Sequence, residues 1–256
     1  MTTPRPQRRL SSLMLVLTAL AIAVPAAPAL AWNWGGEHVQ GSGRIKSETR
    51  ALGHFSGLSM ALPGSVELRT GATESVTIET DDNLLPLIET VIENGTLQIR
   101  PSKRKLDFDT RRLKIVVQAK GVDSLALGGS GSIDADALRG AKVQIDLGGS
   151  GSIKVRGVDS AALSVTLGGS GDLKVAAGTA TRLTVSIGGS GNVDLGKLKA
   201  INASVNIAGS GETAMAVRDT LDVNIAGSGD VNYYGDPKVS TTVIGSGNVN
   251  RMGGAR

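Results

Sequence analysis

The 256-residue sequence contains no cysteine, which excludes both a disulfide framework and a lipid anchor attached to an N-terminal cysteine. Aromatic residues are scarce, with two each of Trp, Tyr and Phe. Because rings are the usual stacking platforms for sugars and bases, their scarcity argues against ligand binding by stacking. Stability must therefore come from an aliphatic core and from backbone hydrogen bonds.

Histidine is also rare, and the only two, His38 and His54, lie in polar surroundings. Without cysteine or a histidine pair, neither a hydrolytic triad nor a zinc site is expected. No glycine-rich segment continues into the Lys-Ser/Thr of a phosphate-binding loop or the third glycine of a dinucleotide fingerprint. We therefore expect no catalytic residues, no metal site and no cofactor.

The first 31 residues have the composition of an export signal. Three arginines precede an apolar run over Leu13–Val24 that is too short to cross a membrane, and Ala29-Leu30-Ala31 forms a small-residue cleavage sequence. Trp32 is the expected first residue of the mature chain. The pair Arg8-Arg9 is followed by a poor match to the twin-arginine pattern, so the general secretory route is favoured.

The formal charge of +4 comes largely from this leader. Removing its three arginines leaves 24 basic and 23 acidic residues. A nearly neutral mature chain gives no electrostatic reason to bind nucleic acid, and it contains no transmembrane segment. The expected compartments are the periplasm, the cell surface or the medium.

The tripeptide Gly-Ser-Gly recurs seven times in the second half of the chain. Its copies begin at Gly129, Gly149, Gly169, Gly189, Gly209, Gly227 and Gly245. The first four steps are 20 residues and the last two are 18. A repeat this regular predicts a solenoid, in which each coil completes the core of its neighbours.

Apolar residues stand in fixed columns on both sides of the tripeptide. The column two residues before it contains Leu127, Leu147, Leu167, Ile187, Ile207, Ile225 and Val243. The column two residues after it contains Ile133, Ile153, Leu173, Val193, Thr213, Val231 and Val249. Alternation with a period of two predicts strands whose apolar faces point inward. Stacked coils are favoured over a meander or propeller of hairpins, because the match between units covers both strands and the turn.

The region before the array is less regular. Asn94-Gly95 between two alternating runs predicts a hairpin over Glu89–Arg100, and Asn83–Ile88 is expected to form a turn or short helical piece. We expect a charged loop over Lys103–Arg112. The segment Gly41–Lys46 contains a lone Gly-Ser-Gly and is a candidate start for the first coil.

Three features together resemble a known family: the Gly-Ser-Gly array, the segment Asp81–Thr90 and the ending Tyr233–Lys238. They are similar to the "putative autotransporter adhesin, head GIN domain" family of exported bacterial proteins, over residues 51–250. The resemblance implies an all-β fold, a right-handed parallel β-helix with coils of about 20 residues. It also implies a surface role without assigned catalytic residues.

This interpretation divides the chain into four parts. Residues 1–31 form the signal peptide, and residues 32–50 a polar, Gly-rich segment. Residues 51–250 form the solenoid, with irregular coils over 51–120 and regular repeats over 121–250. Residues 251–256 are a polar tail.

Three functions remain open at this point. The first is a non-catalytic scaffold for adhesion or cell-envelope interaction, with a protein or polysaccharide ligand. The second is a lyase or hydrolase acting on glycans, for which outward-pointing carboxylates are Asp134, Asp136, Asp146, Asp159, Asp172 and Asp194. The third is self-association through the ends of the solenoid.

Two further surface features could bind ions or polymers, but for both the favoured interpretation is an ordinary solvent-exposed turn or loop. A polar column follows each tripeptide and contains Ser132, Ser152, Asp172, Asn192, Glu212, Asp230 and Asn248. It lacks the ligand pattern of a calcium roll, because aliphatic residues such as Ile133 and Leu173 occupy the aspartate position. A basic cluster contains Lys103, Arg104, Lys105, Arg111, Arg112 and Lys114.

Overall fold

The computed structural model describes residues 37–104 and 106–254. The expected signal peptide lies outside the described residues, as do the start of the polar segment and the last two residues of the tail. We use the term cap for residues 37–119 and the term array for residues 124–254.

The described chain is built from strands and one short 3-10 helix, η1 (Leu85–Leu87). The strands of the cap are β1 (Glu37–Gln40), β2 (Ile45–Ala51), β3 (Gly57–Met60), β4 (Ser65–Thr70), β5 (Ser75–Asp81), β6 (Ile88–Glu93), β7 (Thr96–Pro101), β8 (Leu106–Asp109) and β9 (Lys114–Ala119). The strands of the array are β10 (Ser124–Gly129), β11 (Ser132–Gly149), β12 (Ser152–Gly169), β13 (Asp172–Val175), β14 (Gly178–Gly189), β15 (Asn192–Gly209), β16 (Glu212–Gly227), β17 (Asp230–Tyr234), β18 (Lys238–Gly245) and β19 (Asn248–Gly253).

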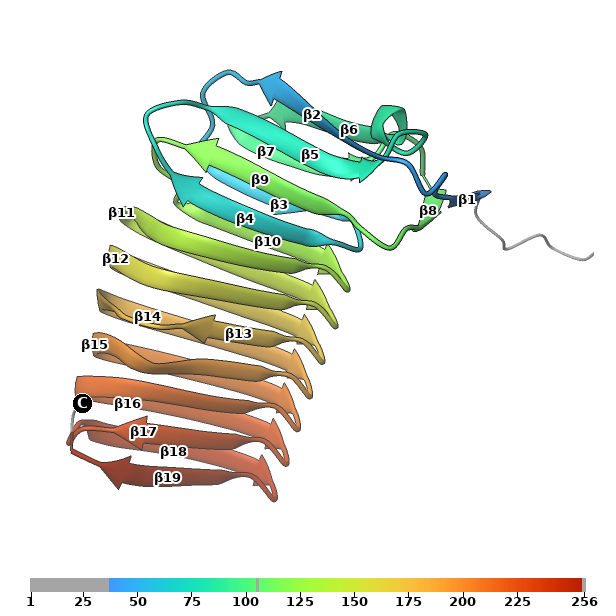
Figure 1. Cartoon of the computed structure of the whole chain (residues 1–256). Coiled ribbons are helices and arrows are strands. Elements are labelled where there is room, and N and C mark those ends of the chain that lie inside the picture. The colour runs from blue at the N-terminus through green and yellow to red at the C-terminus, as the bar shows by residue number, and fades with distance from the viewer. Residues whose placement is uncertain (1–36, 105, 255–256) are drawn as a thin grey trace, which may run out of the picture. The chain divides into compact units, whose positions relative to one another are not determined.

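Successive coils of the array pair in parallel at the register of the sequence repeat (Figure 1). Val165 pairs with Val185, and Gly169 pairs with Gly189. A meander of hairpins would require antiparallel neighbours, so this register decides for stacked coils. The predicted β-solenoid is confirmed, with about six turns.

The apolar columns form the core, as their alternation predicts. Val165 and Val185 are 1% and 0% exposed, whereas Thr166, the next residue after Val165 on the same strand, is exposed. Thr213 is the polar member of its column, and it is fully buried. Its hydroxyl donates to the carbonyl of Val193 in the preceding coil, 3.1 Å away, so the buried hydroxyl is satisfied.

The first glycine of each tripeptide makes the corner possible. Gly189 has φ 134°, and a Cβ built there would lie 2.3 Å from the carbonyl oxygen of Gly169. Side chains other than hydrogen fit neither this backbone conformation nor this contact. The glycine columns are thus a packing requirement of the stacked backbone.

The cap begins as two coils and ends as an antiparallel sheet. β3 and β4 pair in parallel with β10 and β11, at the register of the array. β5 then pairs antiparallel with both β2 and β9. The predicted hairpin is confirmed as β6–β7, with positive φ at Asn94 (51°) and Gly95 (75°). The short helical piece is confirmed as η1.

Two expectations for the cap are corrected by its contacts. Gly41–Lys46 does not start a coil, because β2 runs antiparallel to β5. The loop before β2 is instead held by side chains of the Asp81–Thr90 segment: Asp81 accepts from the backbone N–H of Gly43 (2.6 Å), and Asn83 accepts from that of Ser42 (2.9 Å). Lys103–Arg112 is only partly a loop, because it contains β8, which pairs in parallel with β1.

Candidate binding surfaces

The outer surface of the array has two unlike sides. Over five coils, the part of each strand just before the corner exposes what we call the neutral face. Its outermost columns are Thr166, Ser186, Asn206, Asn224 and Thr242, and, one step nearer the corner, Gly168, Gly188, Ala208, Ala226 and Ile244. None of these side chains is charged. They face solvent because alternate positions of each strand point outward while the aliphatic columns fill the core.

A groove of about 610 Å³ runs over this face and crosses five successive coils. Gly168, Gly188 and Ala208 form its floor, where missing or short side chains leave the backbone uncovered. The amides of Asn206 and Asn224 are joined across one step by a hydrogen bond of 3.1 Å. Because coils stack about 4.8 Å apart, the groove extends for about 20 Å along the solenoid axis. It fits an extended ligand better than a compact one.

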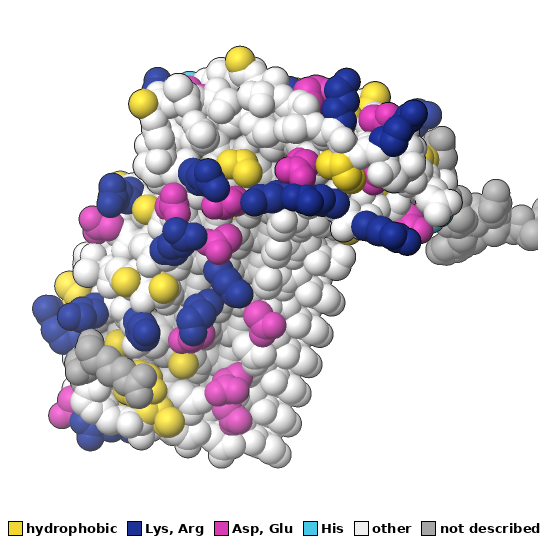
Figure 2. Space-filling model, in the orientation of Figure 1, with side chains coloured by type: hydrophobic (Ala, Val, Ile, Leu, Met, Phe, Trp, Pro, Cys, Tyr) yellow, Lys and Arg dark blue, Asp and Glu magenta, His cyan; other side chains and the backbone are white. Residues whose placement is uncertain are grey.

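The strands that leave each corner expose the charged face. Its ion pairs connect neighbouring coils: Arg156 lies 3.0 Å from Asp136, and Lys174 lies 2.6 Å from Asp194. In the view of Figure 2, basic and acidic side chains are interspersed over the array. Pairing of this kind satisfies the charges locally and leaves no large field of one sign.

A hollow of about 420 Å³ on the charged face is lined by Lys174, Asp194, Glu212 and Tyr234, among other residues. Partial burial alone would raise the pKa of Asp194, but hydrogen bonds from the Lys174 ammonium and the Gly196 backbone N–H lower the pKa below its usual value. A general acid or base that works near neutral pH needs a raised pKa. Asp194 is therefore suited to hold an ion pair and not to transfer protons.

The other five candidate carboxylates point outward as predicted, and the structure brings only two of them together: Asp134 and Asp136 share Arg156. Asp146 accepts from the amide of Gln144. Asp159 accepts from the hydroxyl of Thr179 on the next coil. Each acid thus has a local partner, and the arginine between the first two neutralises them, which is not the arrangement of an acid–base pair across a cleft.

The polar column after each tripeptide is connected by hydrogen bonds. The amide of Asn192 donates to Asp172 (2.9 Å), and the amide of Asn248 donates to Asp230 (2.9 Å). These carboxylate oxygens already accept bonds from the next coil. Within residues 37–254, apart from Lys105, no group of three acidic or histidine side chains is placed to hold a metal ion.

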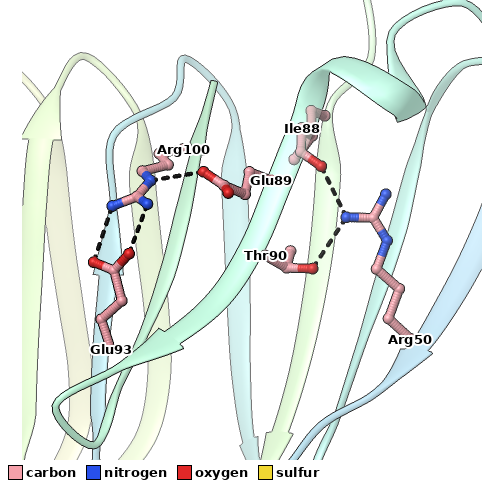
Figure 3. A network of polar contacts seen from close by, with 6 residues as sticks. All are labelled: Arg50, Ile88, Glu89, Thr90, Glu93 and Arg100. Carbon is pink, nitrogen blue, oxygen red and sulfur yellow. Dashed lines mark hydrogen bonds and ion pairs between the residues drawn. The ribbon is translucent and has the colours of Figure 1, made fainter. Parts of the chain in front are cut away.

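The cap is held by arginine networks (Figure 3). Arg50 donates to the carbonyl of Ile88 (2.8 Å) and to the hydroxyl of Thr90 (3.0 Å). Arg100 binds Glu93 with two hydrogen bonds of 2.7 and 3.1 Å, and it also binds Glu89 at 2.9 Å. The hydrogen bonds between Arg100 and Glu93 raise the pKa of the arginine and lower the pKa of the glutamate.

The basic cluster of the cap is split between two places. Lys103 and Arg104 line an open hollow beside Arg100. Arg112 pairs with Glu79 at 2.7 Å, and Lys114 lies 3.7 Å from Glu67. Arg111 is exposed, and Lys105 lies outside the described residues. With two members paired to acids on neighbouring strands, the cluster is not one continuous basic patch.

The two histidines also lie apart. His38 faces Asp107 at 3.6 Å and His54 faces Glu74 at 2.6 Å, both in the cap. The groove of the neutral face was not anticipated from the sequence. The sequence feature that indicates the groove is the column of glycine and alanine one residue before the tripeptides. This column is equally well interpreted as part of the turn.

No helix in the described part of the chain is long and apolar enough to cross a membrane. A comparison with curated proteins finds no match. Solved structures do match. A "putative adhesin" from Bacteroides fragilis superposes with a TM-score of 0.77 at 21% identity, covering 84% of this chain and 100% of that one.

Two further structures are similar over nearly the same length. A "putative lipid binding protein" from Parabacteroides distasonis has a TM-score of 0.69 and 26% identity, covering 84% of this chain and 100% of its own. A "putative adhesin" from Parabacteroides merdae has a TM-score of 0.67 and 21% identity, covering 85% and 100%. The family model described as "Putative auto-transporter adhesin, head GIN domain" matches residues 54–237, which is well over half of the sequence. The chain therefore belongs to this adhesin head GIN domain family.

Proposed function

We propose that this protein is an exported, non-catalytic scaffold that binds a component of the cell envelope or of a cell surface through the groove of its neutral face. The carrying observation is that this groove crosses five coils without meeting a charged side chain. A ligand lying along it would contact equivalent uncharged positions on every coil. Binding energy would then be spread over many weak contacts.

The lining of the groove favours a ligand with an apolar stripe. Its floor is backbone, Gly and Ala, and the side chains of Ile207, Ile225 and Ile244 border it. Burial of apolar surface contributes roughly 25 cal/mol per Å², so an extended contact of this kind can bind without a charged anchor. The name of the Parabacteroides distasonis relative, "putative lipid binding protein", agrees with such a lining.

The carboxylates argue against the rival function of a glycan-active enzyme. Such enzymes place two acids opposite each other in a cleft and raise the pKa of one. Here Asp194 has a lowered pKa, and the remaining acids pair either with Arg156 or with neutral donors. Asp194→Asn should leave binding within a few-fold of the parent, because an exposed ion pair contributes little.

The test of the proposed surface is a pair of matched substitutions. Ala208→Arg places a long charged side chain in the middle of the groove, whereas Ala176→Arg places it at an exposed position outside the groove. Binding to isolated envelope fragments or whole cells should fall at least tenfold for Ala208→Arg and stay near the parent value for Ala176→Arg. Equal binding by both variants would contradict the assignment of the face.

The proposal includes export with removal of residues 1–31 and a mature chain organised as residues 32–50, 51–250 and 251–256. The composition of the leader supports it. Mass spectrometry of the protein recovered outside the cytoplasm should give an N-terminus at Trp32. Full-length chain retained in the cytoplasm would contradict export.

A further inference from the structure

The last coil of the array is covered on one side only. Among the described residues β18 pairs only with β16, and β19 pairs only with β17. Val243 is 38% exposed, although its equivalent one coil earlier, Ile225, is 2% exposed. Ile244 and Met252 on the same coil are 72% and 54% exposed. The aliphatic core therefore continues to the surface at this end, where Figure 1 shows β18 and β19 as the last strands of the stack.

The opposite end of the array is closed by the cap. β10 and β11 are covered by β3 and β4, which are covered in turn by β7 and β9. The two edge strands at that end are protected differently, because both carry charged side chains: β2 has Lys46, Glu48 and Arg50, and β6 has two glutamates. Charged side chains on an edge strand oppose pairing with another strand. The edge strands of the last coil can therefore pair with another strand, whereas the charged edge strands of the cap oppose such pairing.

The open backbone groups of β18 can be assigned from the corner beside it. Ser246 donates its N–H back to Gly227, and Asn248 donates back to Gly229. Even-numbered residues of this coil therefore point their N–H groups to the preceding coil. Because strand residues alternate in direction, Val239, Thr241 and Val243 direct both N–H and C=O to the open end. Buried without partners, such groups would be costly, but they form a row suited to another strand.

We propose that this end is an interface between two copies of the chain, in which β18 of each copy pairs antiparallel with β18 of the other. Since the described strands leave one end of the array uncovered and close the other, the contact is the same patch on both copies and closes as a dimer with two-fold symmetry. The cap of each copy then lies at an outer end. This inference is independent of the ligand proposed for the neutral face.

The chemistry of β18 fits pairing with itself. Its sequence Lys-Val-Ser-Thr-Thr-Val-Ile-Gly has one charge, at Lys238, and pairing centred on Thr241 places the two Thr241 residues opposite each other and Lys238 opposite Ile244. The other basic residue of the coil, Arg251, is engaged within its own copy by the carbonyl of Gly235 (2.8 Å) and by Asp236 (3.4 Å). No like charges face one another in this arrangement.

The strength of the dimer is limited by the cross-section of one coil. Stable complexes bury about 800 Å² on each partner, and the edges of β18 and β19 with their few apolar side chains offer less. We therefore expect dissociation constants of roughly micromolar size. Monomer at low concentration and dimer at high concentration should both be observable.

The first test is sedimentation equilibrium of the purified protein over a range from about 1 to 200 μM, a span set around the expected affinity. The parent and Thr241→Ser should dimerise equally, because both keep the outward N–H. Thr241→Pro removes that N–H without touching a bond to β16, and proline is tolerated on edge strands. It should sediment as a monomer at every concentration while melting close to the parent.

The second test uses the absence of cysteine from the sequence. Mild oxidation should cross-link Thr241→Cys as a covalent dimer, because antiparallel pairing centred on β18 brings residue 241 of each copy together. Ser186→Cys on the neutral face should give no covalent dimer under the same conditions. A parent that is monomeric at 200 μM, oligomers larger than dimers, dimerisation by Thr241→Pro, or no preference for the residue 241 cross-link would each overturn the proposal.

Discussion

The cap and the array are built from the same kind of strand but are stabilised in different ways. In the array, backbone ladders and columns of similar residues repeat from coil to coil, and each residue pairs with its equivalent 18 or 20 residues away. In the cap, single polar contacts join segments about 40 residues apart, as between Asp81 and the loop at Gly43. A substitution in the array should disturb the coils on both sides of it, because each coil packs against its two neighbours in register. A substitution in the cap should affect only the two segments that the lost contact joins.

The largest effect is expected from placing a charge in the array core. Val165→Asp buries an unpaired carboxylate between two coils and should cost about 3–5 kcal/mol of unfolding free energy. Thr166→Asp, one residue further on, faces solvent and should cost roughly 0.5 kcal/mol or less. Thermal melting of both variants measures the difference. Equal melting temperatures would mean that the inward and outward positions are exchanged.

A corner glycine should come next. Gly189→Ala forces a side chain into a backbone region that favours glycine and against the Gly169 carbonyl, for a cost of about 2–4 kcal/mol. Gly188→Ala is the matched control, because its Cβ has nothing closer than 4.0 Å. The equivalent positions on later coils are already Ala208 and Ala226. Chemical denaturation should separate the two variants, and similar midpoints would contradict the packing role of the corner.

The cap should respond to loss of a single buried acceptor. Asp81 is 3% exposed and accepts from the Gly43 N–H and from the Thr110 hydroxyl, each at 2.6 Å. Asp81→Ala leaves the Gly43 N–H unpaired and leaves the Thr110 hydroxyl only the longer bond to the Arg112 carbonyl (3.2 Å), and it should cost about 1–3 kcal/mol. Asp82→Ala removes a contact to the exposed Ser42 and should cost less. Hydrogen exchange should show the loss in β1, β2 and β8 but not in β14 or β15, whereas uniform loss would mean that cap and array unfold as one.

Acid should weaken both regions modestly. The pKa of Glu93 in the cap is lowered by its hydrogen bonds to Arg100, and the pKa of Asp194 in the array is lowered by Lys174 and Gly196 against the opposing effect of burial. A carboxyl group whose pKa is lowered in the folded state stabilises the fold at pH values above its pKa in the unfolded chain, near 4. That stabilisation is lost as the pH falls through the lowered pKa of the folded state. Melting temperature should therefore be flat from pH 7 to about 5 and decline below about 4. Arg100→Met should make the decline shallower, and an unchanged slope would exclude Glu93 as a contributor.

The smallest effect is expected from calcium. The carboxylates of Asp172 and Asp230 already accept hydrogen bonds from the asparagines of the next coil. Addition of calcium at about millimolar concentration, the range of weak extracellular sites, should leave the melting temperature of chelator-treated protein unchanged. A rise that disappears in Asp172→Asn would show that the column binds cations.

The sequence predicted the array better than the cap because the array repeats. Each column is sampled seven times, so a single polar member such as Thr213 does not obscure the inward face. The hairpin at Asn94-Gly95 was predictable because two adjacent residues with positive φ define its turn. By contrast, the partner of the Gly41–Lys46 segment lies about 40 residues away and is found once only, so no local pattern could reveal it.

The candidate surfaces divide in the same way. Strand alternation predicted that the six aspartates point outward, and none of them is buried in the structure. The pairing of Arg156 with Asp136, or of Lys174 with Asp194, depends on which outward residues the coil register places side by side. The groove required both the small-residue column and the stacking of five coils.

By itself, the sequence determined the fold class, the coil period, the inward columns and the need for glycine at the corners, because these follow from local alternation repeated at a fixed interval. The tertiary structure alone decided that the N-terminal region closes one end with an antiparallel sheet, that five coils line up an uncharged groove, and that no other described strand covers the last coil. These features depend on contacts between segments distant in the chain, and the energy of such contacts is set by their positions in space and not by neighbouring residues.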